Sequence, residues 1–113
     1  MRSESSGSVK VFYPPFSRDE LVARLRDGLP ALAEALPLRR VVLFGSWAKG
    51  RATAFSDVDL LVVYAGPPRE DAYAVVRRHL PVRGLEPHVY AQAEAAQLQP
   101  TLDRMTNGGI PLL

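Results

Sequence analysis

Two aspartates separated by a single residue, Asp57 and Asp59, stand at the start of the apolar run Leu60–Val63. The run reads as a strand, and residues two apart in a strand point to the same side. Both carboxylates are therefore expected together, where like charges repel unless a cation lies between them. Mg²⁺ prefers a few carboxylates together with substrate phosphates. The pair thus predicts a divalent-metal site, although paired aspartates beside a loop can also be a solvated turn.

A Gly-Ser turn, Gly45-Ser46, precedes the aspartates and is separated from Asp57 by ten residues. The turn ends the apolar run Val41–Phe44, which is continuous as in a strand buried on both faces. Glycine lets the backbone approach a ligand closely, and free N–H groups at a helix start bind phosphate. With a helix start expected at Trp47, the turn predicts a phosphate site beside the metal site.

A Walker-type P-loop is a competing interpretation of the same glycines. Gly45 and Gly50 have its glycine spacing, but Arg51 and Ala52 stand where that loop needs Lys and Ser or Thr. The P-loop interpretation therefore fails.

The combination of Gly45-Ser46, ten residues, Asp57-x-Asp59 and two flanking apolar strands resembles the DNA polymerase β-like nucleotidyltransferase superfamily. The flanking residues are similar to those of the minimal nucleotidyltransferases of prokaryotes, and residues 38–92 carry the resemblance most clearly. It implies a small α/β (α+β) fold with a mixed sheet of three to five strands and helices packed mainly on one face.

The resemblance also implies roles for particular residues. Asp57 and Asp59 would hold two Mg²⁺ ions, and the third acid of the family matches Glu86 by the order of elements, although the family normally has an aspartate there. Gly45 and Ser46 would hold the β,γ-phosphates of ATP. Two cations are further candidates for the triphosphate, Lys49 and Arg51. The family commonly has Arg where Lys49 stands, and lysine loses bidentate phosphate geometry.

Nucleotidyl transfer is the activity that the resemblance implies: a hydroxyl attacks the α-phosphorus and pyrophosphate leaves. Minimal nucleotidyltransferases are often paired with a helical HEPN protein, and in some pairs they act as antitoxins that transfer AMP from ATP to a tyrosine of the toxin. A HEPN-type partner is therefore the expected acceptor. Two alternatives stay open: a non-catalytic antitoxin or nucleotide-binding module that acts by contact, and a free-standing enzyme acting on a small molecule or nucleic acid.

Composition limits the other possibilities. The 113 residues suffice for one domain, expected over 9–113 after a disordered tail at 1–8. The net charge of +2 does not indicate a nucleic-acid binder, although a patch of Arg77, Arg78 and Arg83 keeps that option open. There is no cysteine, no membrane-length apolar run and no signal peptide at the start, which fits a cytoplasmic protein. A homodimer is compatible with the sequence.

The remaining elements follow from periodicity. Ser17 and Glu20 have capping-box spacing before a leucine stripe, which predicts one kinked helix or two short ones from Arg18 to about Leu36. Helical spacing predicts a second helix over Arg69–Leu80, and alternation predicts a strand over Leu85–Tyr90, where Pro87 indicates an edge. Further expected elements are an extended piece at Val9–Tyr13, short helices at Ala91–Leu98 and Thr101–Met105, and an apolar end at Ile110–Leu113 suited to an edge strand or a partner.

Overall fold

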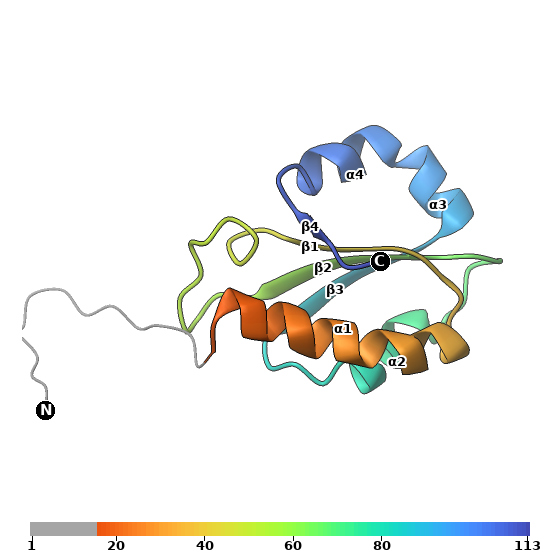
Figure 1. The fold of residues 1–113 in the computed structure, drawn as a ribbon. Coiled ribbons are helices and arrows are strands. Elements are labelled where there is room, and N and C mark those ends of the chain that lie inside the picture. Colours follow the sequence, from red (N-terminus) through yellow and green to blue (C-terminus); the bar gives the residue numbers. More distant parts are fainter. Residues whose placement is uncertain (1–15) are drawn as a thin grey trace, which may run out of the picture.

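The computed structural model describes residues 16–113, so the predicted tail at 1–8 and the extended piece at 9–13 lie outside the described residues. The strands form one four-stranded mixed sheet with the order β3-β2-β1-β4, which confirms the predicted α+β class (Figure 1). The elements in chain order are α1 (Arg18–Ala35), β1 (Leu38–Phe44), β2 (Val58–Tyr64), α2 (Ala72–His79), β3 (Leu85–Ala91), α3 (Gln92–Gln97), α4 (Gln99–Met105) and β4 (Ile110–Pro111).

The sheet topology brings the predicted site residues to one end of the sheet. β1 pairs antiparallel with β2, and β2 pairs parallel with β3 after the crossover through α2. In this register Phe44 lies opposite Asp59, and Asp59 lies opposite Glu86. The end of β1, the connection 45–57 and the start of β3 therefore meet at the same edge.

Helices cover both faces of the sheet. The two longer helices, α1 and α2, lie together on one face, as predicted, whereas the short helices α3 and α4 lie over part of the other face (Figure 1). The second face is covered because Ala95 of α3 and Leu102 of α4 pack on its apolar side chains. These sheet residues are Val42, Phe44, Leu61 and Val63.

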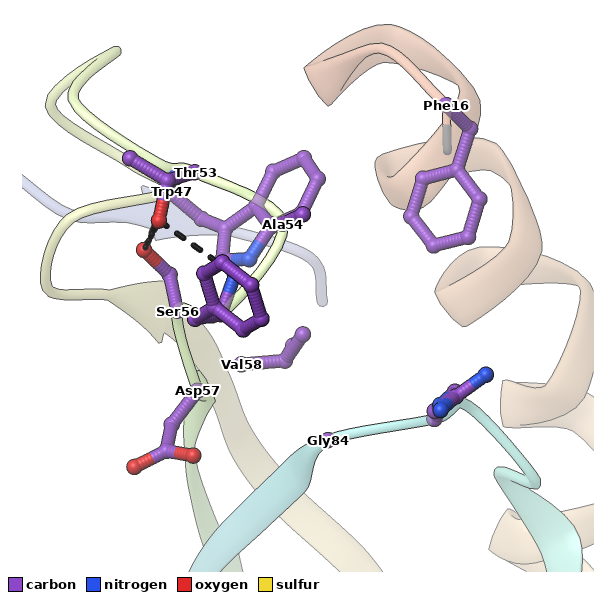
Figure 2. A pocket seen from close by; sticks show the side chains of 10 residues that line it. Phe16, Trp47, Thr53, Ala54, Ser56, Asp57, Val58 and Gly84 are labelled. Carbon is purple, nitrogen blue, oxygen red and sulfur yellow. Dashed lines mark hydrogen bonds between the residues drawn. The ribbon is translucent and has the colours of Figure 1, made fainter. Parts of the chain in front are cut away.

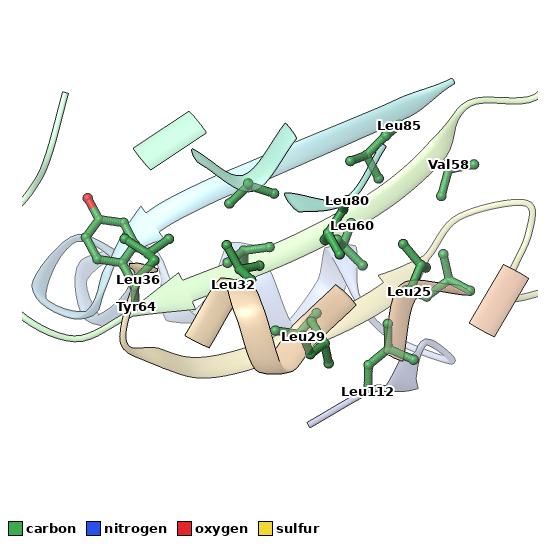
Figure 3. Packing of buried hydrophobic residues seen from close by; sticks show 14 of the residues in the cluster. Leu25, Leu29, Leu32, Leu36, Val58, Leu60, Tyr64, Leu80, Leu85 and Leu112 are labelled. Carbon is green, nitrogen blue, oxygen red and sulfur yellow. The ribbon is translucent and has the colours of Figure 1, made fainter. Parts of the chain in front are cut away.

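The main core lies between α1, α2 and the sheet (Figure 3). α1 contributes the predicted leucine stripe, buried at Leu21, Leu25, Leu29 and Leu32. The helix begins at the predicted capping box, in which the Ser17 hydroxyl accepts from the Glu20 N–H and the Glu20 carboxylate accepts from the Ser17 N–H. Helix α1 thus has a defined start and one buried face.

α1 is one continuous helix that contains Pro30, which decides between the two predicted alternatives. Gly28 does not break it. A Cβ on Gly28 would overlap the Leu80 side chain and the His79 carbonyl, so this glycine lets the end of α2 approach α1 closely. Tertiary packing outweighs the low helix propensity of both residues.

Two local predictions were wrong. No helix begins at Trp47, and residues 45–50 form consecutive turns instead. The Arg51 N–H donates a hydrogen bond to the Ser46 carbonyl, and the Gly50 N–H donates one to the Trp47 carbonyl. The second helix starts at Ala72 rather than Arg69. Before it, the Arg69 side chain pairs with Asp71 and donates to the Ala35 carbonyl at the end of α1.

The sheet edges agree with the sequence. β3 is an outer strand, where the missing N–H of Pro87 is tolerated, and Ile110–Pro111 adds a short outer strand beside β1. None of the helices between residues 16 and 113 is long and apolar enough to cross a bilayer.

Candidate active site

Gly45 brings the Gly-Ser turn into contact with the second aspartate. Its φ of +79° lies in the left-handed region that favours glycine. A Cβ added to Gly45 would collide with Oδ2 of Asp59, so only the bare glycine backbone fits between the end of β1 and this carboxylate. The turn and the acid, which the sequence separates by thirteen residues, are therefore packed against one another.

The two aspartates differ in their exposure. Asp57 is exposed, whereas the Asp59 side chain is only 30% exposed. Asp59 has the Gly45 backbone on one side and the His88 ring on the other, with His88 Nε2 lying 3.8 Å from Asp59 Oδ1. Val58, which stands between the two aspartates in the sequence, is buried in the main core. This confirms the predicted alternation of the strand.

The electrostatic environment of Asp59 opposes its negative charge. Burial raises the pKa of the Asp59 carboxyl above its ordinary value, and repulsion from Asp57 and Glu86 raises it further, while His88 acts in the opposite direction. Two neighbouring acids thus act on Asp59 at this edge of the sheet. Within residues 16–113, no Lys or Arg forms an ion pair with any of them.

Glu86 lies in register with Asp59 on the neighbouring strand, with an exposed side chain. In the described part of the chain, however, no three His, Cys, Asp or Glu side chains converge closely enough to hold a metal ion. The topology thus brings Glu86 beside Asp59 without assembling a finished three-carboxylate cluster. Its place in a metal site stays a prediction.

The chemistry of the donors nevertheless fits a hard divalent cation. Carboxylate oxygens are the ligands that Mg²⁺ prefers. A bound cation would relieve the repulsion that raises the pKa of Asp59. Asp57 and Asp59 would hold such an ion, and the exposed Glu86 side chain is free to turn toward it.

The remaining predicted residues lie on the turn after β1. Ser46 is half-buried, and its carbonyl accepts from the Arg51 N–H at 2.8 Å. The Lys49 N–H returns to the Gly45 carbonyl, and the side chains of Lys49 and Arg51 are exposed. Both cations are thus within five residues of Ser46 along the chain, with side chains exposed to solvent.

His88 and Phe44 belong to the site, although the sequence motif does not include them. Their rings lie 5.3 Å apart between centroids, and the pair borders Asp59 on the side of the sheet that carries α3 and α4. The alternation of β3 places His88 on the same side as Glu86, but its approach to Asp59 depends on the parallel register of β2 and β3. Sequence alone could not provide that register.

A cavity of about 450 Å³ lies between the start of α1 and the connection 53–58. Trp47 forms one wall. It is 4% exposed and its ring centroid lies 5.6 Å from that of Phe16, so Trp47 packs into the fold. Figure 2 shows Val58 directed into the cavity and the carboxylate of Asp57 directed away from it.

Two arginines of the predicted basic patch have defined neighbours in the structure. Arg77 donates to the Leu85 carbonyl at 2.9 Å and lies over the Tyr73 ring, so this guanidinium joins α2 to β3. Arg83 instead lines the cavity. All three arginines remain exposed, so the nucleic-acid alternative stays open.

Comparisons with known proteins identify the family and the fold of the chain. The sequence profile of the family described as Nucleotidyltransferase domain matches residues 23–106. No curated protein matches the chain significantly.

Solved structures show the same fold. A candidate nucleotidyltransferase from Sulfolobus solfataricus has a TM-score of 0.58 at 21% identity, covering 83% of this chain and 80% of that one. A mutant of the toxin–antitoxin pair MntA–HepT has a TM-score of 0.52 at 18% identity, covering 87% of this chain and 73% of that one. At these identities the likeness establishes the fold alone.

Proposed function

The chain belongs to the nucleotidyltransferase domain family, and from that premise we propose that it transfers AMP from ATP to a hydroxyl group of a partner protein. The family membership supports nucleotidyl transfer in general. The nucleotide, the acceptor and the partner are the specific parts of the proposal.

One observation carries the proposal: the Gly45 backbone lies directly against the carboxylate of Asp59. A triphosphate held by the turn would therefore have its phosphates beside the acids. Positioning of this kind accounts for much of the rate acceleration in phosphoryl-type transfers, because the protein takes little part in the covalent chemistry itself.

Each residue has a defined task in the proposed reaction. Gly45 and Ser46 bind the β,γ-phosphates through the turn, with Lys49 or Arg51 adding positive charge. Asp57 and Asp59 would hold Mg²⁺, which when bound supplies charge neutralisation at the attacking and leaving oxygens. Glu86 orients the acceptor hydroxyl and can accept its proton. The hydroxyl oxygen then forms the bond to the α-phosphorus while the bond to pyrophosphate breaks.

One structural neighbour supports a protein partner for this chain. The MntA–HepT pair is a toxin–antitoxin complex, and its mutant carries two Asp-to-Glu changes two residues apart, the spacing of Asp57 and Asp59 here. We infer that the acceptor is a tyrosine of a HEPN-type partner. Similarity to that complex supports this choice, and the pairing of this chain with such a toxin is part of the proposal.

Intact-mass measurement of the partner tests the acceptor directly. The proposed HEPN-type partner, sought in the gene next to the one that encodes this protein, is incubated with this protein, ATP and Mg²⁺. A parallel incubation uses the variant Asp57→Asn/Asp59→Asn in place of the wild type. We expect mass increases in steps of one AMP with the wild type and none with the variant, whose far-UV circular dichroism stays unchanged. An unmodified partner would contradict the proposed acceptor.

The second candidate is a contact-only module that neutralises its partner without chemistry. It is favoured by the absence, within residues 16–113, of three converging metal-binding side chains. The same experiment separates the two functions, because a contact-only module would form a stable complex with an unmodified partner. The double variant would then bind the partner as well as the wild type does.

A further inference from the structure

His88 faces the carboxylate of Asp59, although the motif of a Gly-Ser turn and two aspartates includes no histidine. The imidazole Nε2 lies 3.8 Å from Asp59 Oδ1, and the two side chains are 36% and 30% exposed, so an ion from solvent can reach both. Leu60 and Val89, the next residues along the two strands, pack in the main core on the opposite face of the sheet. His88 and Asp59 therefore share the face that carries α3 and α4.

The distance between these two atoms suits a shared cation better than a direct hydrogen bond. A direct hydrogen bond from nitrogen to oxygen places the two heavy atoms about 2.7–3.2 Å apart. Two donors on one first-row divalent ion lie roughly 3.0–4.2 Å apart, because each bond is about 2.1 Å long and the angle between the bonds is at least about 90°. The 3.8 Å between His88 Nε2 and Asp59 Oδ1 falls in the second interval and outside the first.

The Phe44 ring supports the imidazole in this orientation. The two ring centroids lie 5.3 Å apart with the ring planes at 54°, and Phe44 is itself buried between the sheet and the helices α3 and α4. Phe44 also lies opposite Asp59 in the register of β1 and β2, so strand pairing fixes both neighbours of His88. Metal sites regularly use surrounding groups to orient a ligating imidazole.

We propose that His88 is a nitrogen ligand of the divalent cation that Asp59 holds, which makes this a mixed nitrogen and oxygen site for a first-row transition ion such as Mn²⁺. The inference rests on the proposed function, whose cation it specifies. Imidazole nitrogen is a good ligand for transition ions, whereas Mg²⁺ takes oxygen ligands and keeps several waters. A histidine ligand therefore shifts the preference of the site from Mg²⁺ toward the transition ions.

The pair of His88 and Asp59 is the preformed part of this site. Among residues 16–113, no third His, Cys, Asp or Glu side chain converges on the pair closely enough to hold a metal ion. Glu86 has an exposed side chain two residues before His88 and lies in register with Asp59, and Asp57 is exposed as well. Either carboxylate can complete the donor set by rotating, with water in the remaining positions.

Pulsed electron paramagnetic resonance of Mn²⁺ tests the nitrogen ligand directly. The full chain, without a histidine tag and without nucleotide, is loaded with Mn²⁺, and the electron spin echo is examined for coupling to a directly bound nitrogen nucleus. We expect this coupling in the wild type and its loss in His88→Gln, whose amide retains an oxygen donor. Unchanged far-UV circular dichroism would show that the variant folds.

His79→Gln is the matched control, because His79 is the only other histidine of the chain. His79 lies on α2, and its Nδ1 is 2.9 Å from the Val75 carbonyl oxygen. The nitrogen coupling should persist in His79→Gln. That result identifies His88 as the ligand without relying on the folding of the His88 variant, since no other imidazole remains.

Competition between Mn²⁺ and Mg²⁺ tests the metal preference. The signal of free Mn²⁺ is recorded while Mg²⁺ displaces the ion from the wild type and from both variants. We expect His88→Gln to bind Mn²⁺ about tenfold more weakly than the wild type and to bind Mg²⁺ within about twofold of it. A His88 that only packs against Phe44 or pairs with Asp59 would change both affinities alike.

These outcomes are separate from the transfer reaction. The inference would be overturned by a lack of Mn²⁺ binding, by a wild type without nitrogen coupling, by coupling that disappears in His79→Gln, or by equal effects of His88→Gln on both ions. AMP transfer by such a protein would leave the proposed function in place. Nitrogen coupling through His88 in a protein that transfers nothing would support the ligand and reject the enzyme.

Discussion

Asp59 is held in surroundings that disfavour its own charge. Burial and the neighbouring acids raise its pKa, and the Gly45 backbone prevents the carboxylate from moving away toward β1. Such a group lowers the stability of the metal-free protein while preparing a site for a cation, which is a common compromise at functional sites.

This environment predicts a pH-dependent gain in stability for Asp59→Asn. The pKa of Asp59 in the folded protein lies above the ordinary value of 3.8, so folded Asp59 keeps its proton to a higher pH than unfolded Asp59. The stability of the protein therefore falls as pH rises from the unfolded pKa through the folded pKa. Without metal at pH 7, the variant should unfold at a higher temperature than the wild type. The gain should disappear below pH 3.8, as thermal unfolding in EDTA would reveal.

Asp71 provides a control of opposite sign. The Arg69 guanidinium lowers the pKa of the Asp71 carboxyl, so its charge contributes stability above the ordinary pKa that is lost as pH falls through the lowered one. Asp71→Asn should therefore melt at a lower temperature than the wild type at pH 7. A destabilised Asp59→Asn at pH 7 would show that the surroundings of Asp59 have been misjudged.

Gly45→Ala tests the contact between turn and acid. The variant must adopt a positive φ and also displace the Asp59 carboxylate, so we expect a loss of about 1–3 kcal/mol in the free energy of unfolding and a loss of transfer activity. Gly66→Ala is the matched control, since Gly66 has a φ of +93° but open space around it. If urea unfolding shows the same loss of free energy of unfolding in both variants, backbone strain alone explains the loss. The contact between Gly45 and Asp59 would then contribute nothing.

Among the elements, those with local signals could be predicted from the sequence. The capping box located the start of α1 at Ser17, and the continuous apolar runs located β1 and β2. The turns after Ser46 could not be predicted, because Trp47, Ala48 and Lys49 are compatible with a helix. Trp47 packs against Phe16 and Ala48 accepts from Arg18, contacts that only the folded chain provides.

The residues of the site also divide into those with a local sequence signal and those that only the folded chain brings together. Gly45, Ser46, Asp57 and Asp59 could be proposed from spacing within one stretch. His88 beside Asp59 could not, because it requires β3 to pair in parallel with β2 in one particular register. The cavity likewise needs the start of α1 to lie over the connection 53–58, which no local pattern indicates.

At the level of a single element, Ser17→Ala tests how much the capping box stabilises α1. Removing the hydroxyl leaves the Glu20 N–H without its partner, and we expect a loss of about 1 kcal/mol in the free energy of unfolding. Glu20→Gln preserves a capping-box acceptor for the Ser17 N–H and should be close to the wild type. Unaltered urea unfolding of Ser17→Ala would indicate that tertiary packing alone fixes the start of α1.

In the molecule as a whole, one end of the sheet gathers the residues to which the proposed chemistry is assigned. The hairpin of β1 and β2 contributes the turn and both aspartates, and the parallel strand β3 adds Glu86 and His88. The rest of the core, from the leucine stripe of α1 to the cover of α3 and α4, holds these strands in register.

The most direct test of nucleotidyl transfer compares two labelled forms of ATP. The protein is incubated with Mg²⁺ and an extract of its host containing the acceptor, with ATP labelled at either the α- or the γ-phosphorus. We predict label on an acceptor from α-labelled ATP only, release of the γ-label in pyrophosphate, and no labelling by Asp57→Asn/Asp59→Asn. Labelling from γ-labelled ATP that the extract alone does not give, or equal α-labelling by the double variant, would contradict the assignment of these aspartates to nucleotidyl transfer.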